Sequence, residues 1–192
     1  QRIYDVDVKG IFHCCKAAAP RMIERKKGKI INLGSVAGKI PRLNMAAYCS
    51  AKAAVIHLTK VIALELAPFG INVICHCPGT TETDMVMKTI TGGNPEQLAK
   101  WLAGIPLGRL ATPQDQADVV AFLASDYARH ITGQAINVDG GQVMLWSAGQ
   151  GSRRISAGQN DCSSVRLSEG SAAWFEDIDT VLRLSIPGGY GA

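Results

Sequence analysis

The sequence predicts an α/β fold with a parallel sheet, and three short apolar runs support that prediction. The runs cover residues 29–33, 71–77 and 134–138, with longer segments of helical periodicity between them. Short apolar runs are typical of strands buried on both faces, and strands that alternate with helices form parallel sheets. The chain has 192 residues, 47% of them hydrophobic, which is enough for the core of about one domain.

The first helix is predicted over residues 4–27, and Gly28 is expected to close it. Apolar residues recur in this segment at steps of three and four, as they do on one face of a helix. They are Tyr4, Val8, Ile11, Cys15, Ala18 and Met22. The strand over residues 29–33 follows directly and ends at Gly34-Ser35.

Two further helices separate the remaining strands. One is expected over about residues 46–67, where Ala, Leu, Val and Ile dominate and Pro68 stops the helix. The other is expected over residues 112–125, because a threonine suited to capping is followed by a proline and, three residues after the cap, by an acid. Residues 80–110 form a long excursion with one short helical stretch near 96–102, and excursions of this length are usually functional.

The composition changes near residue 147. From 147 to 173, 11 of 27 residues are Ser or Gly, which is typical of a linker. We therefore expect a domain over residues 1–146 and a largely disordered tail over 147–192, with a short amphipathic helix at about 174–184. Because the chain opens on Gln1 with a helical pattern already under way, we also expect it to be part of a longer protein.

Composition and charge argue against several classes of function. The net charge of +4 is not concentrated in any cluster of five or more basic residues, so we expect no nucleic-acid partner. No uninterrupted apolar run approaches the roughly 18 residues of a spanning helix, and no signal peptide is recognisable, so we expect a cytoplasmic protein without a membrane partner.

The six cysteines are irregularly spaced and do not form a disulfide framework. Two triplets contain both His and Cys, namely residues 13–15 and 75–77. Adjacent residues on a helix or strand point in different directions, so we expect no metal site at either triplet. The cysteines are interpreted as small buried apolar residues.

Tyr48 and Lys52 lie four residues apart at the start of the helix expected over 46–67, on one face and one turn apart. A cation beside a phenol stabilises the phenolate and makes the hydroxyl usable as an acid or a base. The spacing alone is a weak signal, since an ordinary surface pair has the same pattern. Ser35, Pro78-Gly79 and Thr83 strengthen it, because each follows the carboxyl end of a predicted strand, where ligands of open α/β sheets bind.

These residues, in this order, resemble the short-chain dehydrogenase/reductase family. The resemblance runs from Ile3 to Met144 and is carried by Gly28-Lys29-Ile30-Ile31-Asn32, Ser35, Tyr48 with Lys52, Pro78-Gly79, Thr83 and Asp139-Gly140-Gly141. It implies a partial Rossmann-like, doubly wound parallel sheet. It also implies an enzyme that transfers hydride between NAD or NADP and a small alcohol or ketone.

The resemblance also implies a role for each matching residue. Tyr48 would exchange a proton with the substrate oxygen, and Ser35 would hydrogen-bond that oxygen. Lys52 would bind the nicotinamide ribose and favour the Tyr48 phenolate. Thr83 and the backbone of Pro78-Gly79 would hold the nicotinamide carboxamide.

Three departures from the family pattern stand out. Asp7 replaces an Asn of the proton relay, and an ionised Asp accepts hydrogen bonds but donates none, so only a backbone role is expected to survive. Ile74 replaces an Asn on the strand before Pro78, where we expect it to pack. No G-x-G-x-x-G turn occurs anywhere in the chain, so the pyrophosphate cradle is missing and the choice between NAD and NADP is not encoded here. We expect the 192-residue chain to be inactive alone.

The substrate and the partners are less clearly indicated. The segment 80–110 offers apolar side chains with Lys88, Lys100 and Arg109 scattered among them, which suits a mainly uncharged hydroxy or oxo compound. Family members commonly form dimers or tetramers through helices matching 4–27 and 46–67, so the resemblance implies a homo-oligomer of the complete protein. The alternative is a truncated, non-catalytic chain that acts only as an oligomerisation partner.

Overall fold

The structure is a computed structural model, and it describes residues 2–89, 92 and 94–144. The tail expected over 147–192, together with its short helix at 174–184, lies outside the described residues. The residues that the family resemblance covers lie in the unit Gln1–Trp146.

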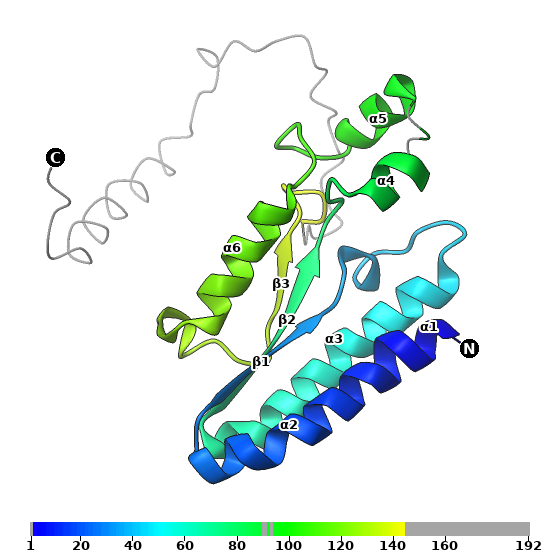
Figure 1. The fold of residues 1–192 in the computed structure, drawn as a ribbon. Coiled ribbons are helices and arrows are strands. Elements are labelled where there is room, and N and C mark those ends of the chain that lie inside the picture. The colour runs from blue at the N-terminus through cyan, green and yellow to red at the C-terminus, as the bar shows by residue number, and fades with distance from the viewer. Residues whose placement is uncertain (1, 90–91, 93, 145–192) are drawn as a thin grey trace, which may run out of the picture. The chain divides into compact units, whose positions relative to one another are not determined.

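A three-stranded parallel sheet runs through the described unit in the order β1-β2-β3 (Figure 1). The strands are β1 (Gly28–Leu33), β2 (Ile71–Pro78) and β3 (Ala135–Val138). Their bounds lie within a residue of the predicted ones. The prediction of an α/β fold with a parallel sheet is therefore confirmed.

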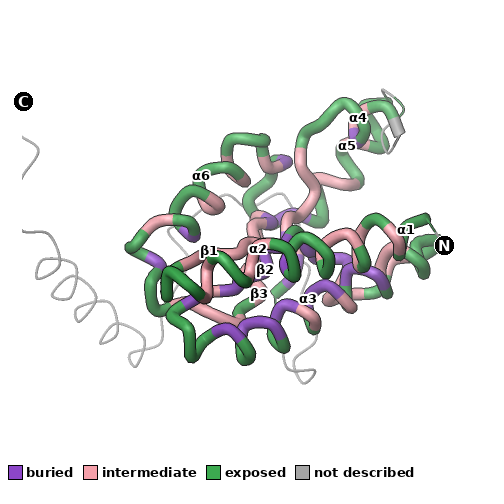
Figure 2. Tube along the Cα trace, turned by 60° about the horizontal axis from the view of Figure 1, so that its bottom comes forward, coloured by how far each residue is buried: buried purple, intermediate pink, exposed green. Residues whose placement is uncertain are grey.

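Helices cover both faces of this sheet (Figure 1). α2 (Ile11–Arg25) and α3 (Ala46–Leu66) pack on one face, and α6 (Pro113–Ala124) packs on the other. Alternate residues of β2 serve the two layers, since Cys75 and Cys77 pack with α3 whereas Ile74 packs with Leu123 of α6. Figure 2 shows the resulting line of buried residues along the inner side of α3.

The amino-terminal helix differs from the single regular helix expected over 4–27. A short α1 (Arg2–Tyr4) continues into a π-helical segment, Asp5–Gly10, and then into α2. π-helical turns inside helices occur frequently at functional sites, and this one contains Asp7.

The helix also ends differently from the prediction. Lys26, not Gly28, adopts the left-handed conformation at the end of α2, with φ of 49°. Gly28 is needed for space instead, because a Cβ at that position would lie 2.5 Å from the sulfur of Met22. The glycine thus permits the start of β1 to pass close to α2.

The segment Ala46–Phe69 is long and apolar enough to cross a membrane by length and composition alone. Core helices of other proteins meet the same criteria, and 33% of the apolar window in this segment is buried. Ala51, Val55 and Thr59, which recur at helical spacing on its inner side, are completely buried. One side of α3 thus packs on the sheet, whereas Val61 and Leu64 are exposed.

The excursion between β2 and α6 holds two short helices, α4 (Asp84–Thr89) and α5 (Pro95–Leu102). The second agrees with the stretch expected near 96–102, whereas the first was not predicted. The start of α6 has the expected capping box, in which the side chain of Thr112 accepts from the backbone of Asp115 and the Asp115 carboxylate accepts from the backbone of Thr112.

Candidate active site

Lys52 and Tyr48 face each other on the first turns of α3. The ammonium of Lys52 lies 5.7 Å from the centroid of the Tyr48 ring. Lys52 is buried and Tyr48 is half-buried. The ammonium donates a hydrogen bond of 3.1 Å to the carbonyl of Leu33 at the end of β1. A positive charge is therefore fixed beside the phenol, at the carboxyl edge of the sheet.

Ser35 lies two residues beyond the end of β1 and caps a single turn of 3-10 helix, Val36–Gly38. The Ser35 hydroxyl oxygen accepts a hydrogen bond of 3.1 Å from the backbone of Ala37. This turn packs against the main chain of α3, because a Cβ on Gly38 would lie 2.6 Å from the carbonyl carbon of Lys52. The segment that carries Ser35 is thus held against the helix that carries Lys52 and Tyr48.

Asp7 reaches the same ammonium from the π-helical segment. Its carboxylate oxygen lies 3.3 Å from the Nζ of Lys52, and the two side chains are 25% and 7% exposed. Ammonium carries three N–H donors, and the contacts to Asp7 and Leu33 engage two of them. One donor of Lys52 is left for a ligand.

Pro78, Gly79 and Thr83 lie at or just beyond the carboxyl end of β2, the strand next to β1. The backbone N–H of Gly79 donates to Val138 of β3 at 3.0 Å, and a Cβ on Gly79 would lie 2.5 Å from the Cβ of Asp139. The Thr83 hydroxyl oxygen accepts from the first turn of α4, which leaves its hydrogen available to a ligand. At position 79, only a glycine permits the ends of β2 and β3 to approach each other so closely.

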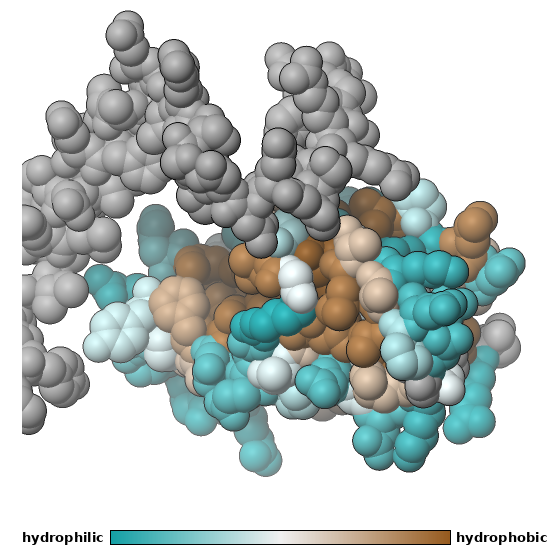
Figure 3. Space-filling view, turned by 90° about the horizontal axis from the view of Figure 1, so that it is seen from above, coloured by the Kyte–Doolittle hydropathy of each residue, from teal (hydrophilic) through white to brown (hydrophobic). Residues whose placement is uncertain are grey.

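Lys39 ties the segment after Ser35 to the far side of the sheet. Its ammonium donates to the carbonyl of Ala135 at 2.6 Å and to the side-chain oxygen of Asn137, both on β3. The segment is therefore fastened to α3 at one point and to β3 at another. Figure 3, seen from above Figure 1 and so onto the strand ends, shows apolar residues gathered in the middle of this face with hydrophilic ones around them.

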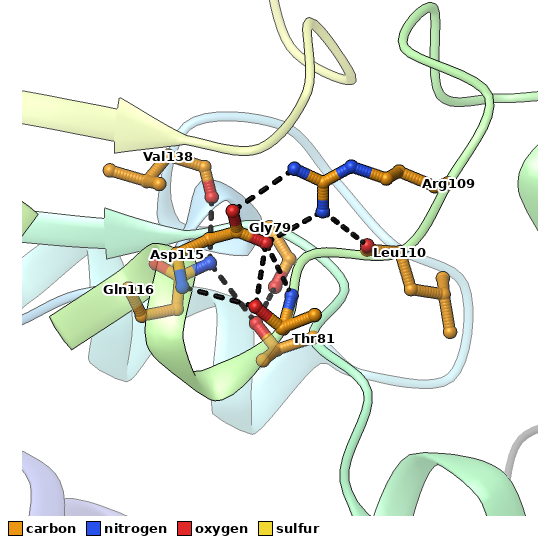
Figure 4. A network of polar contacts seen from close by, with 8 residues as sticks. Gly79, Thr81, Arg109, Leu110, Asp115, Gln116 and Val138 are labelled. Atoms are coloured by element: carbon orange, nitrogen blue, oxygen red, sulfur yellow. Dashed lines mark hydrogen bonds and ion pairs between the residues drawn. The ribbon is translucent and has the colours of Figure 1, made fainter. Parts of the chain in front are cut away.

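A polar network that sequence reasoning missed braces the strand ends from the side of α6 (Figure 4). The side-chain amide of Gln116 donates to the hydroxyl of Thr81 at 3.2 Å and to the carbonyl of Val138 at 3.0 Å. It thereby joins the ends of β2 and β3 to α6. No local sequence signal marks Gln116, because its partners are distant in the chain.

Arg109 and Asp115 form the outer part of this network (Figure 4). Two guanidinium nitrogens of Arg109 donate to the two carboxylate oxygens, at 2.6 Å and 3.0 Å. These hydrogen bonds, followed by those from Thr112, hold the pKa of Asp115 well below its usual range. Arg109, one of the scattered cations of the sequence, is therefore paired with Asp115.

The triplet Cys75-His76-Cys77 is divided between the two faces of β2, as expected. The sulfurs of Cys75 and Cys77 are 3.8 Å apart beneath Gly34, on the side of α3. His76 is 1% exposed, and within the described part of the chain its ring nitrogens have no hydrogen-bond partner. Burial lowers the pKa of His76. Among residues 2–89, 92 and 94–144, no three His, Cys, Asp or Glu side chains are grouped so that they could hold a metal ion.

A parallel sheet with helices on both faces, a Tyr–Lys pair at its carboxyl edge and a serine just beyond β1 is an α/β arrangement of Rossmann type. A family model described as an enoyl-(acyl carrier protein) reductase matches residues 1–142. The chain belongs to the short-chain dehydrogenase/reductase family.

Two curated proteins of Xanthobacter autotrophicus resemble the chain over 146 residues, or 75% of its length. The 2-(S)-hydroxypropyl-CoM dehydrogenase 3 is 44% identical and 57% covered, and the inactive 2-(S)-hydroxypropyl-CoM dehydrogenase 2 is 43% identical and 64% covered. The solved structure of a short-chain type dehydrogenase/reductase from Mycobacterium ulcerans matches with a TM-score of 0.69 and 35% identity, over 72% of this chain and 50% of that one. The chain therefore spans between half and two thirds of the length of these relatives.

Proposed function

We propose that this chain carries the catalytic part of an NAD(P)-dependent oxidoreductase that interconverts a secondary alcohol and a ketone, with Tyr48 as the acid and base. The observation that supports this most directly is the position of Lys52. Its buried ammonium lies 5.7 Å from the Tyr48 ring and is anchored by the Leu33 carbonyl and the Asp7 carboxylate.

The proton chemistry follows from these contacts. In the reducing direction the Tyr48 hydroxyl gives its proton to the substrate oxygen, and in the oxidising direction the phenolate takes the proton back. The fixed charge of Lys52 stabilises the phenolate that appears in the first case and is required in the second. The Ser35 hydroxyl accepts from the backbone of Ala37, so its own hydrogen can be donated to the same substrate oxygen and hold it near Tyr48.

The residues at the strand ends fit the nicotinamide half of the cofactor. Lys52 has a donor left for the ribose hydroxyls, and Thr83 has a hydroxyl hydrogen left for the carboxamide. The missing side chain at Gly79 leaves room for Asp139, so the ends of β2 and β3 lie close together beside these donors. When bound, the nicotinamide supplies or accepts the hydride. Pyrophosphate binding, and with it the choice of NAD or NADP, requires residues beyond this chain, since the sequence holds no G-x-G-x-x-G turn.

A chimera tests the proposal, with the upstream portion of 2-(S)-hydroxypropyl-CoM dehydrogenase 3 placed before residue 1. We expect NAD(P)-dependent turnover of a secondary alcohol, and we expect Tyr48→Phe to lower kcat by about two to four orders of magnitude. Tyr127→Phe is the matched control, because Tyr127 is 86% exposed and should leave kcat unchanged. A Tyr48→Phe chimera with more than half of the parental turnover would refute the assignment.

The second candidate, a non-catalytic oligomerisation partner, is favoured by exposed apolar side chains on the long helices. Val6 is 64% exposed beside α1, and Leu64 is 78% exposed on α3. Light scattering combined with size exclusion separates the two candidates. A chimera that is dimeric or larger but shows no turnover would favour the partner role. Turnover that depends on Tyr48 would favour the enzyme, whatever its oligomeric state.

A further inference from the structure

A hollow of about 320 Å³ lies between the segment after Ser35 and α5, and its size suits a small molecule. It adjoins the candidate active site, because the side chain of Gln142 in its wall accepts from the backbone of Thr80, directly after Gly79. We name it the Arg42–Lys100 pocket, and its lining residues are Ile40, Arg42, Lys100, Trp101, Gly104 and Gln142.

Two cations converge on this pocket from different parts of the chain. The guanidinium of Arg42 lies over the ring of Trp101, 5.7 Å from its centroid, and Lys100 precedes Trp101 on α5. Stacking on an indole fixes the plane of a guanidinium while leaving its N–H groups free to bind a planar oxyanion. The guanidinium of Arg42 is therefore oriented by Trp101 and not by an ion pair with a carboxylate.

The positive charge here is uncompensated within the described residues. Neither Arg42 nor Lys100 forms an ion pair with a carboxylate there, whereas Lys88 is paired with Asp84 and Arg109 with Asp115. Glu96 lies one turn before Lys100 on α5 but does not pair with it in the structure. Arg42 and Lys100 thus differ from Lys88 and Arg109, which are each paired with a carboxylate.

We propose that the Arg42–Lys100 pocket binds an anionic group of the substrate, a carboxylate, sulfonate or phosphate joined by a short linker to the carbon that bears the reacting oxygen. Arg42 makes a two-pronged contact with two oxygens, and Lys100 adds a point charge. Trp101 and Ile40 contact the linker. The claim that the reacting carbon lies next to this anion rests on the proposed function, but the binding of the anion does not. The inference replaces the mainly uncharged substrate expected from the sequence, where Lys100 stood isolated.

Binding can be measured on the 192-residue chain through the fluorescence of Trp101. The chain has three tryptophans, so Trp146→Phe and Trp174→Phe together leave Trp101 as the single reporter. The probes are 3-hydroxybutanoate and its neutral amide, titrated at constant ionic strength so that screening is equal. We expect saturable binding of the acid with a Kd at least tenfold below that of the amide.

Three variants sharpen the test. Arg42→Gln and Lys100→Gln should each raise the Kd of the acid about tenfold and leave that of the amide unchanged. Lys16→Gln, which removes an exposed cation of α2, should change neither Kd. Equal Kd values for acid and amide would overturn the proposal, as would a Kd for the acid that both pocket variants leave unchanged.

This result is separable from the proposed function. Charge-dependent binding in a chain whose chimera shows no hydride transfer would support the pocket and refute the reaction. Turnover of secondary alcohols in the chimera, combined with equal Kd values for acid and amide, would support the reaction and refute the pocket.

Discussion

The carboxylate of Asp7 and the ammonium of Lys52 form an ion pair of 3.3 Å between the π-helical segment and α3. The pair places a carboxylate beside the ammonium that is proposed to stabilise the Tyr48 phenolate. Asp7 therefore contributes a side chain to the site, where the family resemblance left only a backbone role. The remaining contact of Lys52, to the Leu33 carbonyl, does not depend on this carboxylate.

The first prediction concerns Asp7→Asn in the chimera. The amide keeps the shape of the side chain, and the Leu33 carbonyl still holds the ammonium, so kcat should stay within a few-fold of the parent. Steady-state kinetics measures this. A gain of tenfold or more, about 1.4 kcal/mol in the barrier, would mean instead that the carboxylate draws charge away from Tyr48.

The second prediction concerns the contact between the Ser35 turn and α3. Gly38→Ala places a Cβ 2.6 Å from a main-chain carbon of Lys52, which cannot move away as a side chain could. We expect a loss of about 1–3 kcal/mol in the free energy of unfolding, measured by denaturant titration. Gly10→Ala is the control, since its Cβ would meet only an ordinary contact of 3.7 Å. Equal stability of the two variants would contradict this packing of the Ser35 turn against α3.

The third prediction uses the ion pair of Arg109 and Asp115. The pKa of Asp115 is lowered in the folded chain, chiefly by the hydrogen bonds from Arg109, so its contribution to stability is present above the unfolded pKa near 4. Asp115→Asn should lower the melting temperature at pH 7, and the difference from the parent should shrink as the pH falls below about 4. Asp118→Asn, on the same helix, is the comparison. A difference that is independent of pH would contradict the pairing.

The fourth prediction concerns His76. Burial lowers its pKa in the folded chain, so as the pH falls below about 6.5 the unfolded chain binds a proton that the folded chain resists. Stability should therefore decrease from pH 7 to pH 5, and His76→Leu should lessen this decrease because leucine cannot bind a proton in the unfolded chain. His130→Gln, at an exposed position, is the comparison variant, with its melting temperature measured over the same pH range.

The strands and long helices could be predicted because burial imposes a pattern on neighbouring residues. Apolar runs between glycines located β1 and β2, and the capping residues located α6. The left-handed Lys26 and the π-helical turn at Asp5–Gly10 could not be predicted, since both depend on how α2 packs and not on residue preferences. α4 is only six residues long, too short for a helical period to be recognised.

The candidate site divides in the same way. Tyr48 and Lys52 are one helical turn apart, and Ser35 follows a strand, so their position at the carboxyl edge of the sheet could be predicted, while their roles came from the family resemblance. The contact of Asp7 with Lys52 spans 45 residues, and that of Arg42 with Trp101 joins a loop to a helix. Such contacts form only when the helices pack on the sheet, so the sequence near each residue does not predict them.

The ammonium of Lys39 also blocks one edge of the sheet. The carbonyls of Gln134 and Val138 accept hydrogen bonds from β2, so in a parallel ladder Ala135 and Asn137, which alternate with them, face the outer edge of β3. Lys39 occupies that edge, and a charged group there hinders the addition of another strand.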